Sequence, residues 1–392
     1  MFETRKWTRA MPHQNIVLRD LLKPFPWHCV KPAVEKHGAD DLSRKLDTKQ
    51  HLLTLLYGQF SGASSLREVV NGMASHEARL YHLGTEPVKR STLADANAQR
   101  PWQVFSDIFA ALLKQAHRGL RRSASGAVRL IDATGIRLSS LSADWATFSA
   151  DVYGAKAHVV YDPQASCPVY FAVTPATIND ITAAKAMPVE AAATYVYDLG
   201  YYDYGFWAAL DAAGCRFVTR LKKNTPLAVL RENDVPQDGG ILRDRIGLLP
   251  QRLASSRRNP LPKPVREICV LSDSGRELRI VTNDLEAPAA EIAELYRQRW
   301  QIELFFRWIK QTLRIEHFLG TSENAVRIQI AVALIAFLLL RLAYAAQKAV
   351  LRPIDFVRLV RANLMQRRRI DRLLEPPPIP AASNQFSLAL NP

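Results

Sequence analysis

Two acidic residues lie in apolar runs of the sequence, where ionising a carboxyl group costs free energy. Asp132 lies in the middle of a strand-like run, between Ile131 and Ala133. Asp198 ends a second such run and is followed by Gly200, which allows the chain to turn sharply. A carboxylate inside an apolar strand is difficult to ionise unless a cation compensates it, so metal binding would explain both positions. For Asp132 alone, the alternative is a strand-end residue that turns into the following loop.

A third acid, Glu303, lies in the segment LYRQRWQIELFFRWIKQTL, and the pattern predicts a helix from Pro288 to about Leu313. At about 100° per residue, a stripe about 60° wide holds Tyr296, Arg299, Glu303 and Lys310. The adjoining face is apolar and is predicted to face the core. Its residues are Leu295, Ile302, Phe305, Phe306, Ile309 and Leu313. The alternative for the stripe is an exposed ion pair between Arg299 and Glu303, four residues apart.

The elements that must position these residues predict an α/β fold. Strand-like runs cover 128–133, 157–161, 169–174, 194–198 and 216–221, with helical runs at 180–187 and 204–213. The order predicts a mixed sheet with helices on its faces. It matches the order of an RNase H-like core, which we assign to residues 123–345.

Residues 225–285 have a different character from the rest of this core. Six prolines lie between Pro226 and Pro264, and the runs 265–271 and 277–281 alternate like paired strands around Ser274 and Gly275. We therefore expect an inserted β-rich subdomain at about 225–285. Residues 346–392 predict a basic helix followed by a proline-rich tail.

Residues 1–122 predict a separate helical domain. Helical runs at 48–60 and 65–73 flank Gly62, and a third helix begins near Ser91, just after Lys89 and Arg90. This pattern is compatible with a helix-turn-helix that binds DNA, and a helical bundle without a DNA role is the alternative. Residues 114–129 contain five basic residues and no acidic one, which predicts a basic linker between the domains.

The composition favours nucleic acid as the partner. The 392 residues include 52 Lys and Arg against 37 Asp and Glu, a net charge of +15 that attracts polyanions. The four cysteines lie far apart without metal-ligand spacing, which argues against a zinc site and fits a reducing cytoplasm. The most apolar run, from Ile330 to Leu340, is shorter than the about 20 residues of a membrane span, so we expect a buried helix and no membrane partner.

The spacing Y-x2-R-x3-E-x6-K, formed by Tyr296, Arg299, Glu303 and Lys310, resembles the signature of the DDE transposases of the bacterial IS-four insertion-sequence family. The resemblance extends to D-x-T at Asp132, D-x-G-Y at Asp198, VTRLKKN around Lys222, and the amino-terminal segments KHGAD, QFSGASSLRE and YHLGTEPVKRSTLADAN. It covers about residues 12 to 345.

The resemblance implies a catalytic triad of Asp132, Asp198 and Glu303 that holds two divalent ions. Two ions bridged by carboxylates can activate the attacking oxygen and stabilise the leaving oxygen of a phosphodiester. Oxygen ligands suit Mg²⁺, and Mn²⁺ is the expected substitute. The resemblance also implies that Arg299 and Lys310 contact DNA phosphates and that Tyr296 positions a phosphate or a terminal nucleotide.

The family resemblance implies a cut-and-paste DNA transposase of the bacterial cytoplasm and nucleoid. Its partners would be double-stranded DNA, both terminal inverted repeats and target, and a second copy of the chain in the DNA complex. The alternatives are an RNase H-like nuclease without strand transfer and a decayed DNA-binding repressor. Some relatives stack a flipped base on a tryptophan of the insertion, but residues 225–285 contain none, so the hairpin route stays open. We expect Trp207, Trp300 and Trp308 to pack in the core or between helices.

Overall fold

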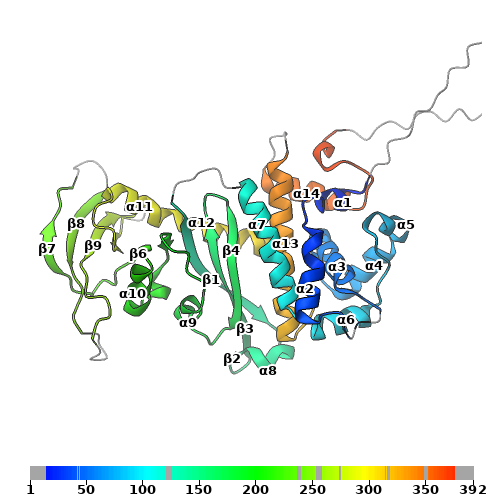
Figure 1. Ribbon diagram of the computed structural model, residues 1–392, viewed down its shortest axis with the longest axis horizontal. Coiled ribbons are helices and arrows are strands. Elements are labelled where there is room, and N and C mark those ends of the chain that lie inside the picture. Colours follow the sequence, from blue (N-terminus) through cyan, green and yellow to red (C-terminus); the bar gives the residue numbers. More distant parts are fainter. Residues whose placement is uncertain are drawn as a thin grey trace, which may run out of the picture.

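The computed structural model describes residues 15–41, 43, 45–120, 126–235, 240–252, 258–272, 275–313, 315, 318–347 and 352–375. A helical body and a sheet-containing body lie side by side along the long axis, and α13 lies at their junction (Figure 1). The predicted tail beyond residue 375 and residues 121–125 of the predicted linker lie outside the described residues.

Helices dominate the chain up to residue 120, as the sequence predicts. They are α1 (Val17–Leu21), α2 (Val30–His37), α3 (Thr48–Ser61), α4 (Leu66–Ala74), α5 (Glu77–Leu80), α6 (Arg90–Gln99) and α7 (Gln103–Leu120). The α3–α4 turn is fixed by Gly62 in the left-handed conformation (φ 75°) and by Ser65, whose side chain accepts from the backbone N–H of Glu68. The linker prediction was wrong for residues 114–120, because they continue the amphipathic helix α7.

The sheet contains ten strands. They are β1 (Val128–Leu138), β2 (Thr147–Ser149), β3 (Val152–Asp162), β4 (Cys167–Pro175), β5 (Thr194–Val196), β6 (Arg216–Arg220), β7 (Ala228–Glu232), β8 (Ile241–Leu248), β9 (Val265–Leu271) and β10 (Glu277–Thr282). The order is β2-β3-β1-β5-β6-β10-β9-β8-β7, and β4 pairs with β3. Strands β1, β5 and β6 are parallel neighbours, and the other pairings are antiparallel.

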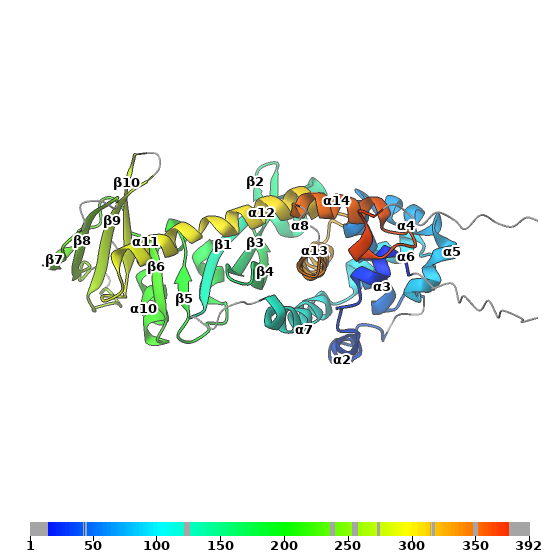
Figure 2. The ribbon, with the colours of Figure 1, turned by 90° about the horizontal axis from the view of Figure 1, so that it is seen from above.

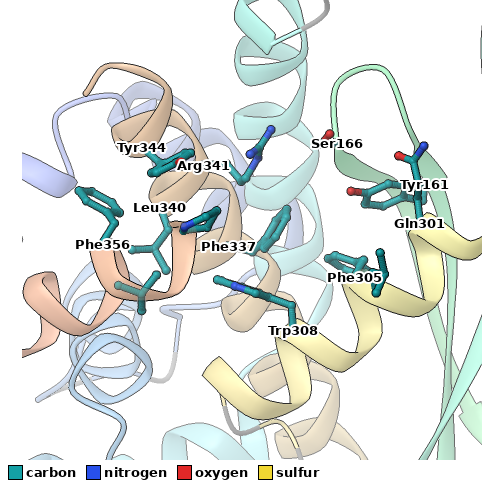
Figure 3. Close-up of a pocket in the computed structure, with 13 residues that line it drawn as sticks. Tyr161, Ser166, Gln301, Phe305, Trp308, Phe337, Leu340, Arg341, Tyr344 and Phe356 are labelled. Carbon is teal, nitrogen blue, oxygen red and sulfur yellow. The ribbon is translucent and has the colours of Figure 1, made fainter. Parts of the chain in front are cut away.

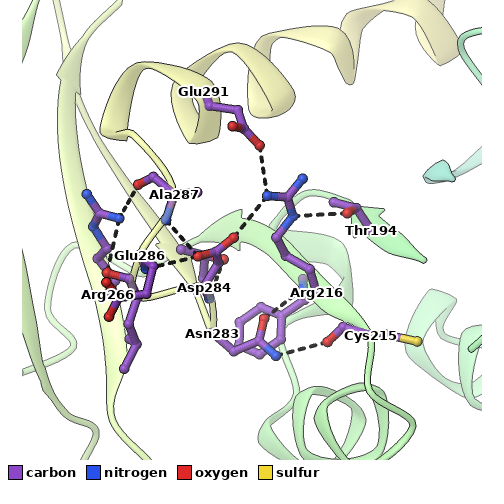
Figure 4. A network of polar contacts seen from close by, with 12 residues as sticks. Thr194, Cys215, Arg216, Arg266, Asn283, Asp284, Glu286, Ala287 and Glu291 are labelled. Atoms are coloured by element: carbon purple, nitrogen blue, oxygen red, sulfur yellow. Dashed lines mark hydrogen bonds and ion pairs between the residues drawn. The ribbon is translucent and has the colours of Figure 1, made fainter. Parts of the chain in front are cut away.

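The four strands of residues 225–285 continue this sheet and do not form a separate one. Strands β9 and β10 pair with each other as the alternation predicts, and β10 also pairs with β6. Polar contacts reinforce this joint, since Arg216 of β6 donates to Asp284 and Glu291 at 2.9 Å each (Figure 4). The joint therefore ties β6 to the turn after β10 and to the start of α11.

The remaining helices cover the sheet or follow it. They are α8 (Ala143–Ala146), α9 (Asp180–Lys185), α10 (Tyr204–Ala212), α11 (Ala289–Gln298), α12 (Trp300–Leu313), α13 (Glu323–Ala345) and α14 (Pro353–Asn363). Helices α11 and α12 form a long, nearly continuous rod along one side of the sheet, and α10 lies on the other side (Figure 2). Two apolar clusters fill these two sides, one containing Leu130 and Ile302 and the other containing Tyr195 and Trp207.

Helix α13 contains the predicted apolar run. It is the one helix among the described residues that is long and apolar enough to cross a membrane, and 78% of its most apolar window is buried inside the structure. It packs against α3, α6 and α7 of the helical body and against α12. The run is therefore a core helix, as the sequence predicts.

Aromatic side chains join α12 to α13. The ring of Phe337 lies 5.0 Å from that of Phe305 and 5.2 Å from that of Trp308. These three residues line an apolar cavity of about 240 Å³, with Arg341 and Tyr344 at its other side (Figure 3). The packing predictions for Trp308 and for the fully buried Trp207 are confirmed, whereas the prediction for Trp300 was wrong because its side chain is 49% exposed.

Candidate active site

Asp132 lies on β1, and Asp198 follows the neighbouring strand β5. The parallel register of β1 and β5 pairs Leu130 with Val196, and each acid follows two residues later. Leu130 and Val196 belong to the apolar cluster under α12, and side chains alternate along a strand, so Asp132 falls on that face. Strand β1 continues past Asp132 to Leu138, so Asp132 is not a strand-end residue.

Each of the two aspartates has one oxygen held by a backbone N–H. The amide of Ala133 donates to Oδ1 of Asp132 at 2.8 Å, and the amide of Gly200 donates to Oδ1 of Asp198 at 2.8 Å. In this way Asp198 caps the short 3-10 helix Leu199–Tyr201. These bonds fix the orientation of both carboxylates, and the described part of the chain gives the second oxygen of each no backbone donor.

The stripe on the α11–α12 rod meets these acids. The helix is interrupted at Arg299, whose Nη2 lies 2.6 Å from Oε1 of Glu303, and the guanidinium lies 5.8 Å from the centre of the Tyr296 ring. Lys310 donates from Nζ to the carbonyl oxygen of Gly135 on β1 at 3.0 Å. The predicted apolar face of the rod is buried throughout: Leu295, Ile302, Phe305, Phe306, Ile309 and Leu313 are at most 6% exposed.

The electrostatics of Asp132 show that these groups act on one another. The pKa of Asp132 is raised to about 6, first by burial and then by Asp198 and Glu303, while the Ala133 amide and Arg299 act in the opposite direction. Asp198, Glu303 and Arg299 therefore lie within electrostatic range of Asp132, and the metal-binding role of the three acids stays a prediction. The guanidinium of Arg299 is the cation that compensates this acidic group in the free protein.

Arg220 occupies the position on β6 that corresponds to Asp132 on β1 and to Asp198 after β5. It was not among the predicted site residues. The register of β5 and β6 pairs Val196 with Val218, so Arg220 follows Val218 as Asp198 follows Val196. Its Nε is buried and has no hydrogen-bond partner among the described residues, as is also true of Nε of Arg299. The sequence segment VTRLKKN contains Arg220, and the alternation of a parallel strand could have placed it beside Asp198.

The donor set fits a divalent cation of the Mg²⁺ type. As the side chains stand, no three His, Cys, Asp or Glu residues in the described part of the chain are close enough to enclose an ion. Asp132, Asp198 and Glu303 nevertheless offer only hard oxygen donors, and a bound cation would offset both the burial and the neighbouring negative charges that raise the pKa of Asp132.

Lys89 and Arg90 lie apart from the three acids. Lys89 is the residue before α6, Arg90 begins that helix, and both side chains are exposed. Helix α6 belongs to the helical body, away from β1 and β5 (Figures 1 and 2). Arg90 lines a shallow surface pocket together with Ser65 and Arg67 at the start of α4. The structure thus gathers a second basic group at the ends of two helices.

Comparison with known proteins identifies the sheet-containing part of the chain. Residues 123–339 match the family described as "Transposase DDE domain", and residues 13–86 match a domain of unknown function (DUF4372). The chain is 42% identical over 287 residues to a Sinorhizobium fredii protein named as transposase y4zB, a match that covers 73% of this chain and 80% of that protein. It is 29% identical over 259 residues to a Geobacillus stearothermophilus protein named as the transposase for insertion sequence element IS5377, covering 65% of this chain and 67% of that protein.

Among solved structures, the chain is similar to the piggyBac transposase in its synaptic complex with hairpin DNA. The identity is 10% and the TM-score is 0.44, with 95% of this chain and 84% of that chain covered, and we draw no argument from this distant likeness. The family match covers more than half of the 392 residues, and the relative from Sinorhizobium fredii supports it independently. The chain therefore belongs to the DDE transposase family and is a DNA transposase.

Proposed function

We propose that this transposase is a cut-and-paste enzyme of the IS-four group. It binds the terminal inverted repeats of its element, cuts the DNA at both ends and joins the freed 3′ ends to target DNA. The observation that carries the proposal is the convergence of four charged groups from three elements: Asp132 on β1, Asp198 after β5, and Arg299 with Glu303 at the α11–α12 junction.

In this proposal Asp132, Asp198 and Glu303 hold two Mg²⁺ ions, for which Mn²⁺ can substitute. When bound, such ions activate the attacking oxygen and stabilise the leaving oxygen of the phosphodiester. The chain contributes the orientation of the ligands, since Ala133 and Gly200 each fix one carboxylate oxygen.

The basic residues around the acids supply phosphate contacts. We assign Arg299 and Lys310 to phosphates beside the cut and Tyr296 to a phosphate or terminal nucleotide, and we add Arg220, whose free Nε lies level with Asp198. Arg299 has two alternative partners, Glu303 in the free protein and a DNA phosphate in the complex. If Glu303 were to hold a cation, the guanidinium of Arg299 would be available to the phosphate, so metal binding and DNA binding would favour the same arrangement of these two residues.

Recognition of the element ends is assigned to the helical body. The α3–α4 pair with its tight Gly62 turn and the exposed Lys89, Arg90 and Arg67 form a basic surface on paired helices, which suits duplex DNA. Two ends must be held together for coordinated cutting, so we assign the active form to a homodimer on DNA.

Strand transfer of a pre-cut end tests this function. The purified chain with Mg²⁺ should join a duplex carrying a 3′ hydroxyl at the element end to a supercoiled target, and Glu303→Gln should abolish the joining. A nuclease would cut the duplex without producing joined products. A decayed repressor would bind the ends and do neither, and either outcome would replace the proposed function.

A further inference from the structure

A hairpin with exposed apolar side chains projects from the catalytic sheet. Residues 139–152 lie between β1 and the body of β3 and include β2, and we call this segment the β2 hairpin. Its Leu141, Phe148 and Val152 are 75%, 55% and 45% exposed. The hairpin projects past α12 (Figure 2). It therefore lies on the same side of the sheet as the α11–α12 rod.

The fold anchors the β2 hairpin at its base. The side chains of Ser142 and Trp145 both donate to the carbonyl oxygen of Thr321, at 2.7 and 3.1 Å. Asp151 adopts the left-handed conformation (φ 58°) in the turn between β2 and β3. A segment that is held in this way and still exposes three large apolar side chains is typical of a protein-binding surface.

The charge of the β2 hairpin indicates the kind of partner. Residues 139–152 contain Asp144 and Asp151, both exposed, and no Lys or Arg, although the whole chain has a net charge of +15. This segment would repel DNA phosphates. A protein surface that is apolar and positively charged would complement it.

The chain itself carries such a surface on the rod. Leu304, which lines the apolar cavity of about 240 Å³ between α12, α13 and α14, is 44% exposed (Figure 3). Trp300, one turn earlier on α12, is 49% exposed and extends the apolar surface. We call the cavity together with these two residues the α12 groove.

Cations surround the α12 groove. Arg341 lines the cavity, and its Nε is buried without a hydrogen-bond partner among the described residues. The guanidinium of Arg307 lies 5.9 Å from the centre of the exposed tryptophan ring. Asp355, on the part of α14 that borders the cavity, is ion-paired with two arginines. The groove thus has an excess of positive charge, the reverse of the β2 hairpin.

We propose that the β2 hairpin of each chain docks in the α12 groove of a second copy of this chain. Phe148 then enters the cavity, and Asp144 and Asp151 face the two free arginines of the groove, Arg307 and Arg341. A second copy is the occupant because one chain supplies both complementary surfaces. The inference rests on the homodimer of the proposed function and names its interface.

The positions of the two surfaces allow a closed, symmetric pair. Val152 in the hairpin and Tyr161 at the cavity lie nine residues apart on β3, a separation of about 30 Å. A two-fold axis between them brings each hairpin to the partner's groove, so both contacts form together. Burying the exposed halves of these apolar side chains at both contacts removes about 1,000 Å² of surface, the lower end for specific complexes. The free chain should therefore associate weakly, and the dimer should be favoured on DNA.

Site-directed cross-linking of the full chain tests the interface. Cys29 is the one cysteine that is not buried, so all chains carry Cys29→Ser. A chain with Phe148→Cys is mixed with a chain with Leu304→Cys, and a short bismaleimide is added with and without the element-end duplex. We expect a covalent dimer from the mixture, with a higher yield on DNA. Phe148→Cys alone should give little, because the two hairpins lie at opposite ends of the interface.

Variants of the hairpin test the same interface without a cross-linker. Phe148→Ser, and separately Asp144→Lys with Asp151→Lys, should weaken self-association in sedimentation experiments by about tenfold or more. Val229→Ser changes an exposed apolar residue of β7 and should leave self-association unchanged. The melting temperature of each variant should match the parent, because the replaced side chains are exposed.

The outcomes separate this inference from the proposed function. Parent-like self-association of both hairpin variants would overturn the inference, as would cross-linking of Phe148→Cys with itself as efficiently as with Leu304→Cys. A parent chain that joins DNA ends but forms no dimer at any step would remove the interface and the homodimer together. A chain that dimerises through the hairpin but joins no ends would support this inference while the proposed function fails.

Discussion

Arg299 and Glu303 form an ion pair of 2.6 Å at the point where the rod of α11 and α12 is interrupted. The side chains are only 17% and 31% exposed, and Asp132 lies within electrostatic range of the guanidinium. The ion pair of the alternative explanation is therefore present, although it is part-buried and not exposed, and the catalytic role of Glu303 stays a prediction. The two residues form a pair at i,i+4, and the pair is directed at the acids of the candidate site and not at solvent.

Replacing Arg299 by alanine should destabilise the metal-free protein. The loss leaves Glu303 and Asp132 without their cation, and we expect the free energy of unfolding to fall by about 1 to 3 kcal/mol, between the values for exposed and buried pairs. Saturating Mg²⁺ should restore much of this loss, because the ion replaces the guanidinium charge. Chemical denaturation with and without Mg²⁺ measures both effects.

The matched control is Arg327→Ala, which breaks another i,i+4 pair with Glu323 on α13. Its stability should not respond to Mg²⁺. A loss in Arg299→Ala that is the same with and without Mg²⁺ would show that the guanidinium and the ion do not compete for Glu303.

Charge-removing changes in the acids should abolish cleavage without loss of DNA binding. Asp132→Asn, Asp198→Asn and Glu303→Gln keep the shape of each side chain but remove a ligand charge, so cutting of donor DNA should fall by several orders of magnitude. Gel-shift affinity for the element end should stay within a few-fold of the parent. Ca²⁺ should support binding but little cutting, because its larger coordination sphere does not impose the same geometry. Parent-like cutting by Glu303→Gln would contradict the assigned mechanism.

Stability should depend on pH through Asp132. Its pKa rises from 3.8 to about 6 on folding, first because of burial, so the folded state binds this proton more tightly than the unfolded state. The charged form thus costs stability above about pH 6, and the cost disappears as the pH falls toward about 4. Asp132→Asn should raise the free energy of unfolding at pH 8 by at most about 3 kcal/mol, with a gain that shrinks toward pH 4.

Asp203 is a comparison residue, because its replacement should change the free energy of unfolding in the opposite direction to that of Asp132. Hydrogen bonds from Lys185 and from the amide of Phe206 outweigh its burial and lower its pKa. Asp203→Asn should therefore reduce the free energy of unfolding near pH 7, and the loss should vanish as the pH falls below its lowered pKa. Denaturation curves between about pH 2 and pH 8 in metal-free buffer test both signs. A pH-independent effect of Asp132→Asn would show that its carboxylate is not strained by its neighbours.

The basic surface near α6 should account for part of the salt dependence of DNA binding. Lys89→Ala with Arg90→Ala removes two phosphate contacts and should reduce the slope of log affinity against log salt by about 2. Lys23→Ala with Lys31→Ala removes the same charge elsewhere on the helical body and should leave the slope nearly unchanged. Equal slopes for both double variants would shift end recognition away from α6.

Much of this architecture follows from local patterns in the sequence. The strands around Asp132 and Asp198 and the buried face of α12 were predicted, because alternation and helical spacing report directly on burial. The full length of β1 was not predicted, because residues 134–138 extend this strand only by pairing with β3. The row containing Arg220 depends on the register of three strands, which no local pattern encodes.

Two other differences have tertiary causes. Residues 114–120 carry a linker-like composition, yet they continue α7, which packs on α2 and α13. Trp300 is exposed because the interruption at Arg299 and the apolar face of α12 leave it on the outer side of the rod, 5.9 Å from the guanidinium of Arg307. Contacts distant in sequence decide the first case, and the geometry of the rod itself decides the second.

The position of α13 constrains which segments related transposases can exchange by recombination during evolution. This helix lies at the end of the region that matches the DDE domain, but it packs against α3, α6 and α7 from the other end of the sequence. An amino-terminal segment acquired from a relative would meet the recipient's α13, whose fully buried side chains fit only the original helices. New end specificities should therefore arise by substitutions on the exposed face of α6, or by exchanges that carry α13 and the amino-terminal helices together.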